Sequence, residues 1–200
     1  MNSRAVIDKA PLVVGIGGTT RPDSSSERSL RLALDRVQAL GCRTRLFAGG
    51  DLILPLYEPG THERAAEPFL SAIRQADALV IASPCYHGAV SGLVKNALDY
   101  LEETAGDSSP YLHARAVGLI ACGYGGQGPA MVLAQLRNIV HALRGWPTPL
   151  GIALNSAIVR FNDGSCSDQH TAAQIELMAA QLADFAGAGR RHQAAVKGAA

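Results

Sequence analysis

Residues 78–101 carry three signals in direct succession: a continuous apolar run, a short polar loop and an amphipathic helix. The apolar run at residues 78–82 is typical of a strand in a parallel sheet, because helices cover both faces of such a sheet. The helix that follows has apolar residues at helical spacing, namely Val90, Leu93, Val94, Ala97, Leu98 and Leu101. The loop between them therefore lies at the carboxyl end of a buried strand, where open α/β sheets bind their ligands.

The same alternation of strand and helix runs along most of the chain. Further strands are predicted at residues 12–16, 43–47, 116–121 and 150–154, and further helices at 25–40, 63–75, 129–143 and 171–185. Short βα units of this kind predict an α/β fold, a doubly wound five-stranded parallel sheet with helices on both faces. The strand at residues 43–47 is polar enough for an edge, which favours the strand order 2-1-3-4-5.

Composition limits the possible functions. The chain has 200 residues, of which 48% are hydrophobic, enough for one domain that we assign to residues 11–186. Residues 1–10 are expected to be an extension, and residues 187–200 to lack fixed structure. A net charge of +1 gives no basic stripe for a nucleic acid. No secretory signal or membrane-spanning run is present, so we expect a cytoplasmic protein that does not enter the membrane.

The first loop, after the strand at residues 12–16, is rich in groups that bind phosphate. Thr19, Ser24, Ser25 and Ser26 supply hydroxyl groups, and Arg21 supplies a guanidinium group. The serines stand where a helix begins, so free N–H groups and the helix dipole add to the site. The loop is neither a Walker loop nor a G-x-G-x-x-G fingerprint. An ordinary N-cap remains an alternative interpretation.

The second and third loops suit a flat heteroaromatic ring. The second contains Pro84, Cys85, Tyr86, His87 and Gly88, which combine backbone N–H groups with an aromatic and an imidazole side chain. The third contains Gly123, Gly125 and Gly126, which let backbone lie against a ring without a Cβ clash. The alternatives are that Tyr86 is ordinary surface, that His87 is only a polar contact, and that the third loop is a flexible turn.

No set of catalytic side chains or metal ligands is visible. The four cysteines, Cys42, Cys85, Cys122 and Cys166, form no C-x-x-C pair, so neither a zinc knuckle nor a thioredoxin-type motif is expected. The chain also lacks HExxH and GxSxG motifs and a carboxylate pair in a polar cleft. A nucleophilic role for Cys85 would require a base for which the sequence gives no candidate. A cofactor that performs the chemistry itself is consistent with this pattern.

The string SPxYHGxxSGxxKNAxDYL, from Ser83 to Leu101, resembles the signature of the NADPH-dependent FMN reductase family. This family consists of flavodoxin-like flavoproteins and includes azo-, quinone- and chromate-reducing members. The first loop is similar to the G-S-x-R-x-x-S phosphate loop of that family, with Thr19 at the serine position, and the glycine-rich third loop matches in order. The resemblance covers residues 12–144 and implies the flavodoxin-like strand order.

The resemblance implies that FMN binds with its phosphate on the first loop and its ring against the other two, and that NADPH or NADH donates the hydride. The implied activity is that of an NAD(P)H:FMN oxidoreductase, with a flavin-dependent monooxygenase as a possible recipient of reduced flavin. One alternative is an FMN-containing quinone, azo-compound or chromate reductase. The others are a flavodoxin-type electron carrier, although carriers are typically acidic, and a domain without flavin.

The resemblance also implies assembly. In similar proteins the signature helix packs against its copy in a second subunit, which predicts a homodimer or a homotetramer. The residues alone show only that one face of this helix is strongly apolar, which packing on the sheet would explain equally well. Lys95 and Asp99 are spaced for a surface ion pair on the same helix. The sequence does not distinguish NADH from NADPH, and it does not identify the electron acceptor.

Overall fold

The computed structural model describes residues 10–61, 63–162 and 164–198. Its central sheet contains the parallel strands β1 (Leu12–Gly17), β2 (Arg43–Ala48), β3 (Ala78–Tyr86) and β5 (Ala116–Gly123). A fifth position is filled by two short strands, β6 (Trp146–Pro147) beside the start of β5 and β7 (Ile152–Asn155) beside its end. The order β2-β1-β3-β5-β6 confirms the predicted 2-1-3-4-5 arrangement, with the polar strand at the edge.

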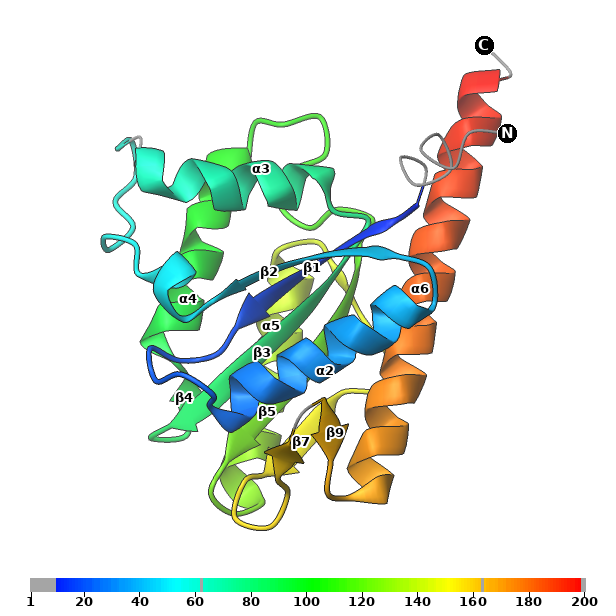
Figure 1. Ribbon diagram of the computed structural model, residues 1–200. Coiled ribbons are helices and arrows are strands. Elements are labelled where there is room, and N and C mark those ends of the chain that lie inside the picture. The colour runs from blue at the N-terminus through cyan, green and yellow to red at the C-terminus, as the bar shows by residue number, and fades with distance from the viewer. Residues whose placement is uncertain (1–9, 62, 163, 199–200) are drawn as a thin grey trace.

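Helices cover both faces of the sheet (Figure 1). The helices α2 (Ser25–Ala39) and α6 (Gln169–Gly198) pack on one face. The helices α3 (Glu67–Gln75), α4 (Gly92–Asp99) and α5 (Gln127–Ala142) pack on the other. Three short 3-10 helices join these elements: η1 (Gly49–Leu52), η2 (Arg64–Ala66) and η3 (Tyr100–Thr104). The strands between the layers are almost entirely buried, as the continuous apolar runs predicted.

Two predicted elements have different bounds. The helix expected at residues 63–75 divides into η2 and α3, because Pro68 fits only the first turn of a helix and α3 therefore begins beside it. The segment expected to be a loop at residues 83–88 is largely strand. There β3 continues to Tyr86 and pairs antiparallel with β4 (Ala89–Val90), so that α4 begins only at Gly92.

The C-terminal region departs furthest from the prediction. Helix α6 continues to Gly198, into residues 187–200, which the sequence led us to expect without fixed structure. Alanine-rich sequence has high helix propensity, which accounts for the extension. A hairpin of β8 (Phe161–Asn162) and β9 (Ser165–Cys166) precedes this helix and was not predicted. Residues 1–9 of the expected N-terminal extension lie outside the described residues. No helix in the described ranges has the length and apolarity needed to cross a membrane.

Candidate functional site

The three loops meet at one edge of the sheet. The strands β1, β3 and β5 are neighbours and run parallel, so their carboxyl ends emerge side by side, at the lower left of the sheet in Figure 1. The first loop joins β1 to α2, the second is the hairpin between β3 and β4, and the third joins β5 to α5. Residues far apart in the sequence are thereby gathered at the position where this class of sheet binds ligands.

The first loop leaves β1 in close contact with β3. The N–H group of Gly18 donates to the carbonyl oxygen of Ala82 at 3.2 Å. A Cβ atom on Gly17 would lie 2.0 Å from the same oxygen, and φ of Gly17 is +152°. Only glycine is compatible with this approach. The sequence at this position therefore determines how tightly the loop is held against the sheet.

The start of α2 collects polar groups. Ser24 is the N-cap residue, and its hydroxyl accepts from the N–H group of Glu27 at 3.2 Å. The hydroxyl oxygens of Ser24 and Ser26 are 3.2 Å apart. The N–H groups of Ser25 and Ser26 belong to the first turn, where a helix provides no carbonyl partner. Hydroxyl and amide donors thus lie together at the positive end of the helix dipole.

The charges around this helix start leave one cation available. The carboxylate of Glu27 accepts two hydrogen bonds from Arg31, at 2.7 and 3.0 Å. Asp23 lies 3.7 Å from the guanidinium group of Arg28. Arg21 is exposed and has no ion-pair partner among the described residues. The two carboxylates that would oppose an anion are therefore paired, and the guanidinium group without an ion pair belongs to the same loop, three residues before the N-cap Ser24.

Thr19 has a different place from the other loop residues. Its side chain is buried, and its hydroxyl accepts from the N–H group of Arg21 and donates to the carbonyl oxygen of the same residue, both at 3.0 Å. The hydroxyl therefore closes a turn inside the loop. This turn sets the position from which the Arg21 side chain leaves the backbone.

The second loop is a two-residue hairpin turn. Tyr86 pairs with Ala89 across it, and both central residues have positive φ, +53° at His87 and +77° at Gly88. This combination is that of a type I′ turn, in which the non-glycine residue is the strained one. His87 is exposed, as is Tyr86, 53% of whose surface is accessible, while Pro84 is buried beneath them. The hairpin thus extends aromatic and imidazole groups beyond the sheet.

Cys85 packs between the second and third loops. A Cβ atom on Gly128 would lie 2.7 Å from its sulfur, and one on Gly123 would lie 3.1 Å from its Cβ. The described residues provide no base hydrogen-bonded to this thiol. The other cysteine at a strand end, Cys122, is buried on the opposite face, and burial raises the pKa of its thiol to about 12. Neither thiol has the surroundings of an activated nucleophile.

The third loop is open on its outer side. Gly125 has φ of +98°, and a Cβ atom on either Gly125 or Gly126 would meet no atom within 4 Å. The N–H group of Gly125 donates to Oδ1 of Asn155 at 2.9 Å, so this donor is already used within the protein. Tyr124 stands between these glycines and the strand, with 91% of its surface exposed. Sequence reasoning did not single out Tyr124 or Asn155.

Comparison with known proteins agrees with this geometry. Residues 11–158 match the NADPH-dependent FMN reductase family. The chain belongs to this family. An NADH-dependent FMN reductase, SfnF, of Pseudomonas fluorescens is 30% identical over 86% of this chain and 89% of its own length. An FMN-dependent NADPH-azoreductase of Staphylococcus haemolyticus is 33% identical over 58% of this chain and 60% of its own length.

Solved structures support the fold assignment of this FMN reductase family member. FerB, an NAD(P)H:acceptor flavoenzyme from Paracoccus denitrificans, superposes with a TM-score of 0.73 at 20% sequence identity. The superposition covers 89% of this chain and 98% of FerB. At this identity the similarity establishes the α/β fold and its parallel sheet alone. Together with the family match, it confirms the flavodoxin-like architecture predicted from the sequence.

The residues present fit the cofactor of this family. FMN carries one dianionic phosphate. The start of α2 provides first-turn amides and two hydroxyl groups, and Arg21 in the same loop has no ion pair among the described residues. The flavin ring is flat, and the third loop leaves open space over Gly125 and Gly126. Two exposed tyrosines lie on these loops, Tyr86 at the end of β3 and Tyr124 in the third loop itself. An anionic end and an aromatic end of one ligand therefore both meet suitable chemistry at the same sheet edge.

A separate cleft of about 460 Å³ lies between α2 and the β8–β9 hairpin. Its charged lining consists of Asp23, Arg28, Arg31 and Asp35. Arg28 donates to the carbonyl oxygen of Phe161 at 2.6 Å, and Arg31 is held by Glu27. The arginines are thus engaged with groups of the protein itself, and the cleft has no excess of either charge. We assign the functional site to the three loops and not to this cleft.

Proposed function

We propose that this protein binds FMN across the three loops and uses it to oxidise NAD(P)H. The phosphate would be held by Arg21, Ser24, Ser25 and Ser26, within a loop shaped by Thr19. The ring would lie against residues 84–88 and the glycines of the third loop. The observation that carries the proposal is the adjacency of β1, β3 and β5, which brings a helix start rich in hydroxyl and amide donors and two further loops to one edge of the sheet.

The side chains of the three loops indicate which part of the reaction the cofactor would perform and which part the protein would perform. Bound FMN would supply the redox chemistry, taking a hydride from the nicotinamide and passing electrons to an acceptor. The protein's part is to bind and orient. Gly125 and Gly126 leave one side of the ring position uncovered for a second flat group, and Tyr86 and Tyr124 border it with exposed aromatic surface. We assign no acid or base, since His87 is exposed on a turn with no hydrogen-bond partner among the described residues.

Two versions of this function are possible, and they differ in the electron acceptor. In the first, reduced FMN leaves for a flavin-dependent monooxygenase, which accords with the name of the relative aligned over 89% of its length, an FMN reductase. In the second, FMN stays bound and an azo compound, quinone or metal oxyanion is reduced in place. The azoreductase relative accords with this version over a shorter alignment. A cytoplasmic location would give either version access to NAD(P)H.

The test is oxidation of NADPH and NADH by the purified protein, followed at increasing concentrations of added FMN. An FMN reductase shows saturable dependence of the rate on added FMN. A reductase with prosthetic FMN is isolated yellow and needs an azo dye or quinone, but no added flavin. A colourless protein that fails to bind FMN and to oxidise either nucleotide in its presence would overturn the proposal.

We further propose that the protein is a homodimer, or a homotetramer of two such dimers, built around α4. In the single chain the apolar stripe of α4 is covered, because Val94, Ala97 and Leu98 are buried against the chain's own core. The support comes instead from the segment beside α4. Asn96 donates to the carbonyl oxygen of Pro55 at 2.9 Å and accepts from the N–H group of Tyr57 at the same distance.

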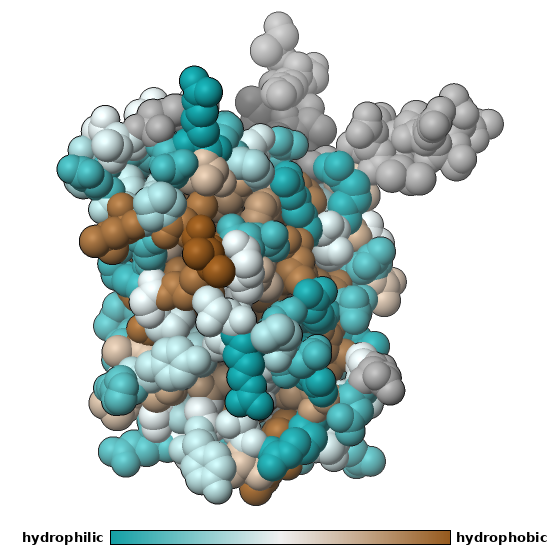
Figure 2. Space-filling view, turned by 60° about the vertical axis from the view of Figure 1, so that its left-hand side comes forward, coloured by the Kyte–Doolittle hydropathy of each residue, from teal (hydrophilic) through white to brown (hydrophobic). Residues whose placement is uncertain are grey.

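That segment leaves large apolar side chains on the surface. Leu56 is 86% exposed and Ile53 is 64% exposed, next to the helix that similar proteins use for pairing. Figure 2 shows apolar surface gathered on the side of the molecule that carries α3 and α4. A dimer that covers it predicts a mass of at least twice 20.9 kDa by light scattering at micromolar concentration. A monomer that binds FMN and oxidises NADPH normally would refute the assembly and leave the activity intact.

A further inference from the structure

A glutamine side chain on α5 joins that helix to the second loop. Nε2 of Gln135 donates to the carbonyl oxygen of Gly88 at 2.8 Å, and Oε1 accepts from the N–H group of Val90 at 3.2 Å. Both ends of one amide are therefore used, one on the turn itself and the other on β4. Because α5 begins where the third loop ends, Gln135 also couples the second loop to the element that follows the third.

An asparagine side chain holds the third loop in a similar way. Oδ1 of Asn155, at the end of β7, accepts from the N–H group of Gly125 at 2.9 Å and from that of Ala157 at 2.9 Å. The backbone adds a bond from Ser156 N–H to the carbonyl oxygen of Gly123 at 2.8 Å. The third loop is thus attached to the neighbouring strand β7.

Both loops need such support, because their own residues contribute little of it. His87 holds a positive φ that non-glycine residues rarely adopt, and Gly125 has no Cβ contact within 4 Å. Exposed backbone with few apolar contacts is mobile unless side chains fix it. We propose that Gln135 and Asn155 are positioning residues, which hold the second and third loops at the separation that the flavin ring requires. This inference rests on the proposed FMN site.

The two amides differ in a way that makes the inference testable. Asn155 acts only as an acceptor in its two bonds, so an aspartate can replace it and keep both. Gln135 acts as donor and acceptor, so a glutamate can accept from Val90 N–H but opposes the carbonyl oxygen of Gly88. The acid should therefore be tolerated at position 155 and not at position 135. A role limited to side-chain volume predicts no such difference.

The experiment is titration of the apoprotein with FMN and with riboflavin, followed by quenching of flavin fluorescence. Asn155→Leu, Gln135→Met and Gln135→Glu should each weaken the binding of both flavins about tenfold, by the same factor for each, because the loops face the ring that the two flavins share. Asn155→Asp should remain within about threefold of the wild type. The matched control for Gln135→Met is Asn138→Met. Asn138 is exposed on α5, the helix that also carries Gln135, and its side chain has no hydrogen bond among the described residues.

Two further measurements distinguish a residue that positions the flavin loops from one that only stabilises the fold. They are the thermal unfolding of each apoprotein and the visible circular dichroism of each bound flavin. Positioning predicts an altered flavin signal in Gln135→Met and Gln135→Glu while the apoprotein melts within a few degrees of the control. Flavin affinities equal to those of Asn138→Met, or equal losses for Asn155→Asp and Asn155→Leu, would overturn the inference. If the wild type itself binds no flavin, the proposed function fails together with this inference. If the wild type and every variant bind flavin equally well, only the inference fails.

Discussion

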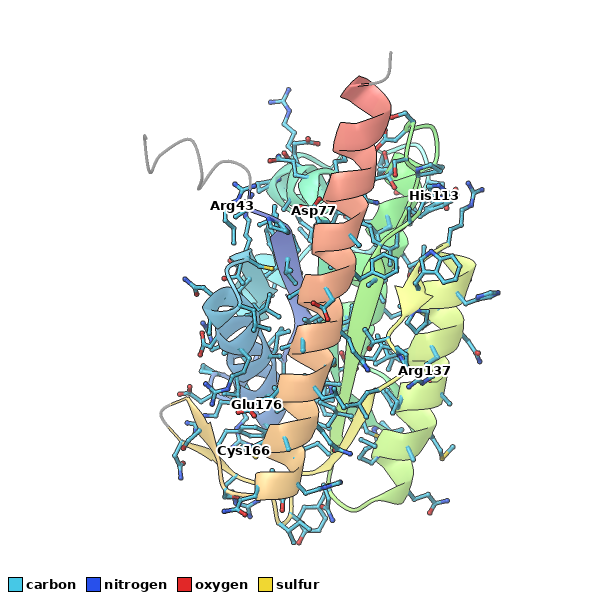
Figure 3. The ribbon with its side chains drawn as sticks, turned by 90° about the vertical axis from the view of Figure 1, so that its right-hand side faces the viewer. Arg43, Asp77, His113, Arg137, Cys166 and Glu176 are labelled. Atoms are coloured by element: carbon cyan, nitrogen blue, oxygen red, sulfur yellow. The ribbon has the colours of Figure 1, made fainter. Side chains whose placement is uncertain are left out.

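The two ends of the sheet are built on opposite principles. At the amino end, where β3 and β5 begin, a buried arginine joins neighbouring segments of backbone by hydrogen bonds. Arg115 donates to the carbonyl oxygens of Ala76 and Tyr111 at 2.8 Å each and to that of Arg74 at 3.2 Å. Asp77 accepts from the N–H group of Leu12 at 2.7 Å and so ties β3 to β1. Figure 3 shows Asp77 and His113 toward this end of the molecule and Cys166 toward the other.

At the carboxyl end, the three loops present backbone and side-chain groups to the solvent. Two of these loops are held in place by side chains on their protein side. The first loop ends in the first-turn amides of α2, for which the helix itself provides no carbonyl partner, and the other two loops expose Tyr86 and Tyr124. Their supports, Gln135 and Asn155, bond the loops from the protein side. We therefore expect stability to be concentrated at one end of the strands and the proposed ligand binding at the other. Variants at the two ends should therefore separate unfolding from flavin affinity.

The largest expected effect is on stability, from Arg115→Met. The substitution removes three hydrogen bonds made by a buried guanidinium group, which should lower the free energy of unfolding by about 3 kcal/mol. That corresponds to a fall of roughly 6–12 °C in the melting temperature of a chain of this size. Burial lowers the pKa of the Arg115 guanidinium group, while Asp77 and Asp107 oppose the shift. An arginine remains protonated at neutral pH even so, and the three hydrogen bonds of Arg115 are kept.

The control for this variant is Arg64→Met. Arg64 is exposed, and its side chain has no hydrogen bond among the described residues, so its loss should leave the melting temperature nearly unchanged. Below their melting temperatures both variants should bind FMN within about twofold of the wild type, because neither touches the three loops. If Arg115→Met melted like Arg64→Met, the amino end would not be the stabilising end of the sheet.

The next effect is on phosphate recognition, from Arg21→Ala. Loss of a charge-assisted bond of about 1.5–3 kcal/mol should weaken FMN binding roughly ten- to a hundredfold. Riboflavin, which lacks the phosphate, should bind both proteins equally, and the melting temperature of the apoprotein should not change because the side chain is exposed. Fluorescence titration with the two flavins measures this directly. A wild type that binds FMN and riboflavin with the same affinity would show that the first loop is not a phosphate site.

Much of this arrangement could be predicted from residue pattern alone, and the part that could not has a common cause. The alternating apolar runs predicted the strands, and the polar second strand predicted its place at the edge. The three candidate loops could be proposed from the sequence because the residues of each loop are neighbours along the chain. Gln135 could not be found, since its partners are 45 and 47 residues away and an isolated glutamine on a helix carries no signal. Asn155 is likewise 30 residues from Gly125.

The apolar stripe of the signature helix illustrates the same limit. Its spacing correctly predicted a buried face, but spacing does not state which surface covers that face. In the folded chain Val94 and Leu98 pack in the chain's own core, while the exposed apolar residues, Ile53 and Leu56, come from a segment with no helical period at all. Contacts made only by tertiary folding, whether polar or apolar, are therefore the part that residue pattern does not contain.

The smallest effect is expected from Cys85→Ser, which tests whether the carboxyl end contributes chemistry or only shape. The thiol packs against the third loop, where a Cβ atom on Gly128 would be 2.7 Å from the sulfur, and it has no neighbouring base among the described residues. Serine keeps the backbone and nearly the same volume, so NAD(P)H oxidation should stay within a few-fold of the wild type. The measurement is the steady-state rate of NADPH oxidation with FMN affinity determined in parallel. A loss of about a thousandfold or more with flavin still bound is the size expected for removal of a reacting group. Such a loss would mean that the thiol takes part in the reaction, and the proposed separation between a cofactor that reacts and a protein that positions it would then be wrong.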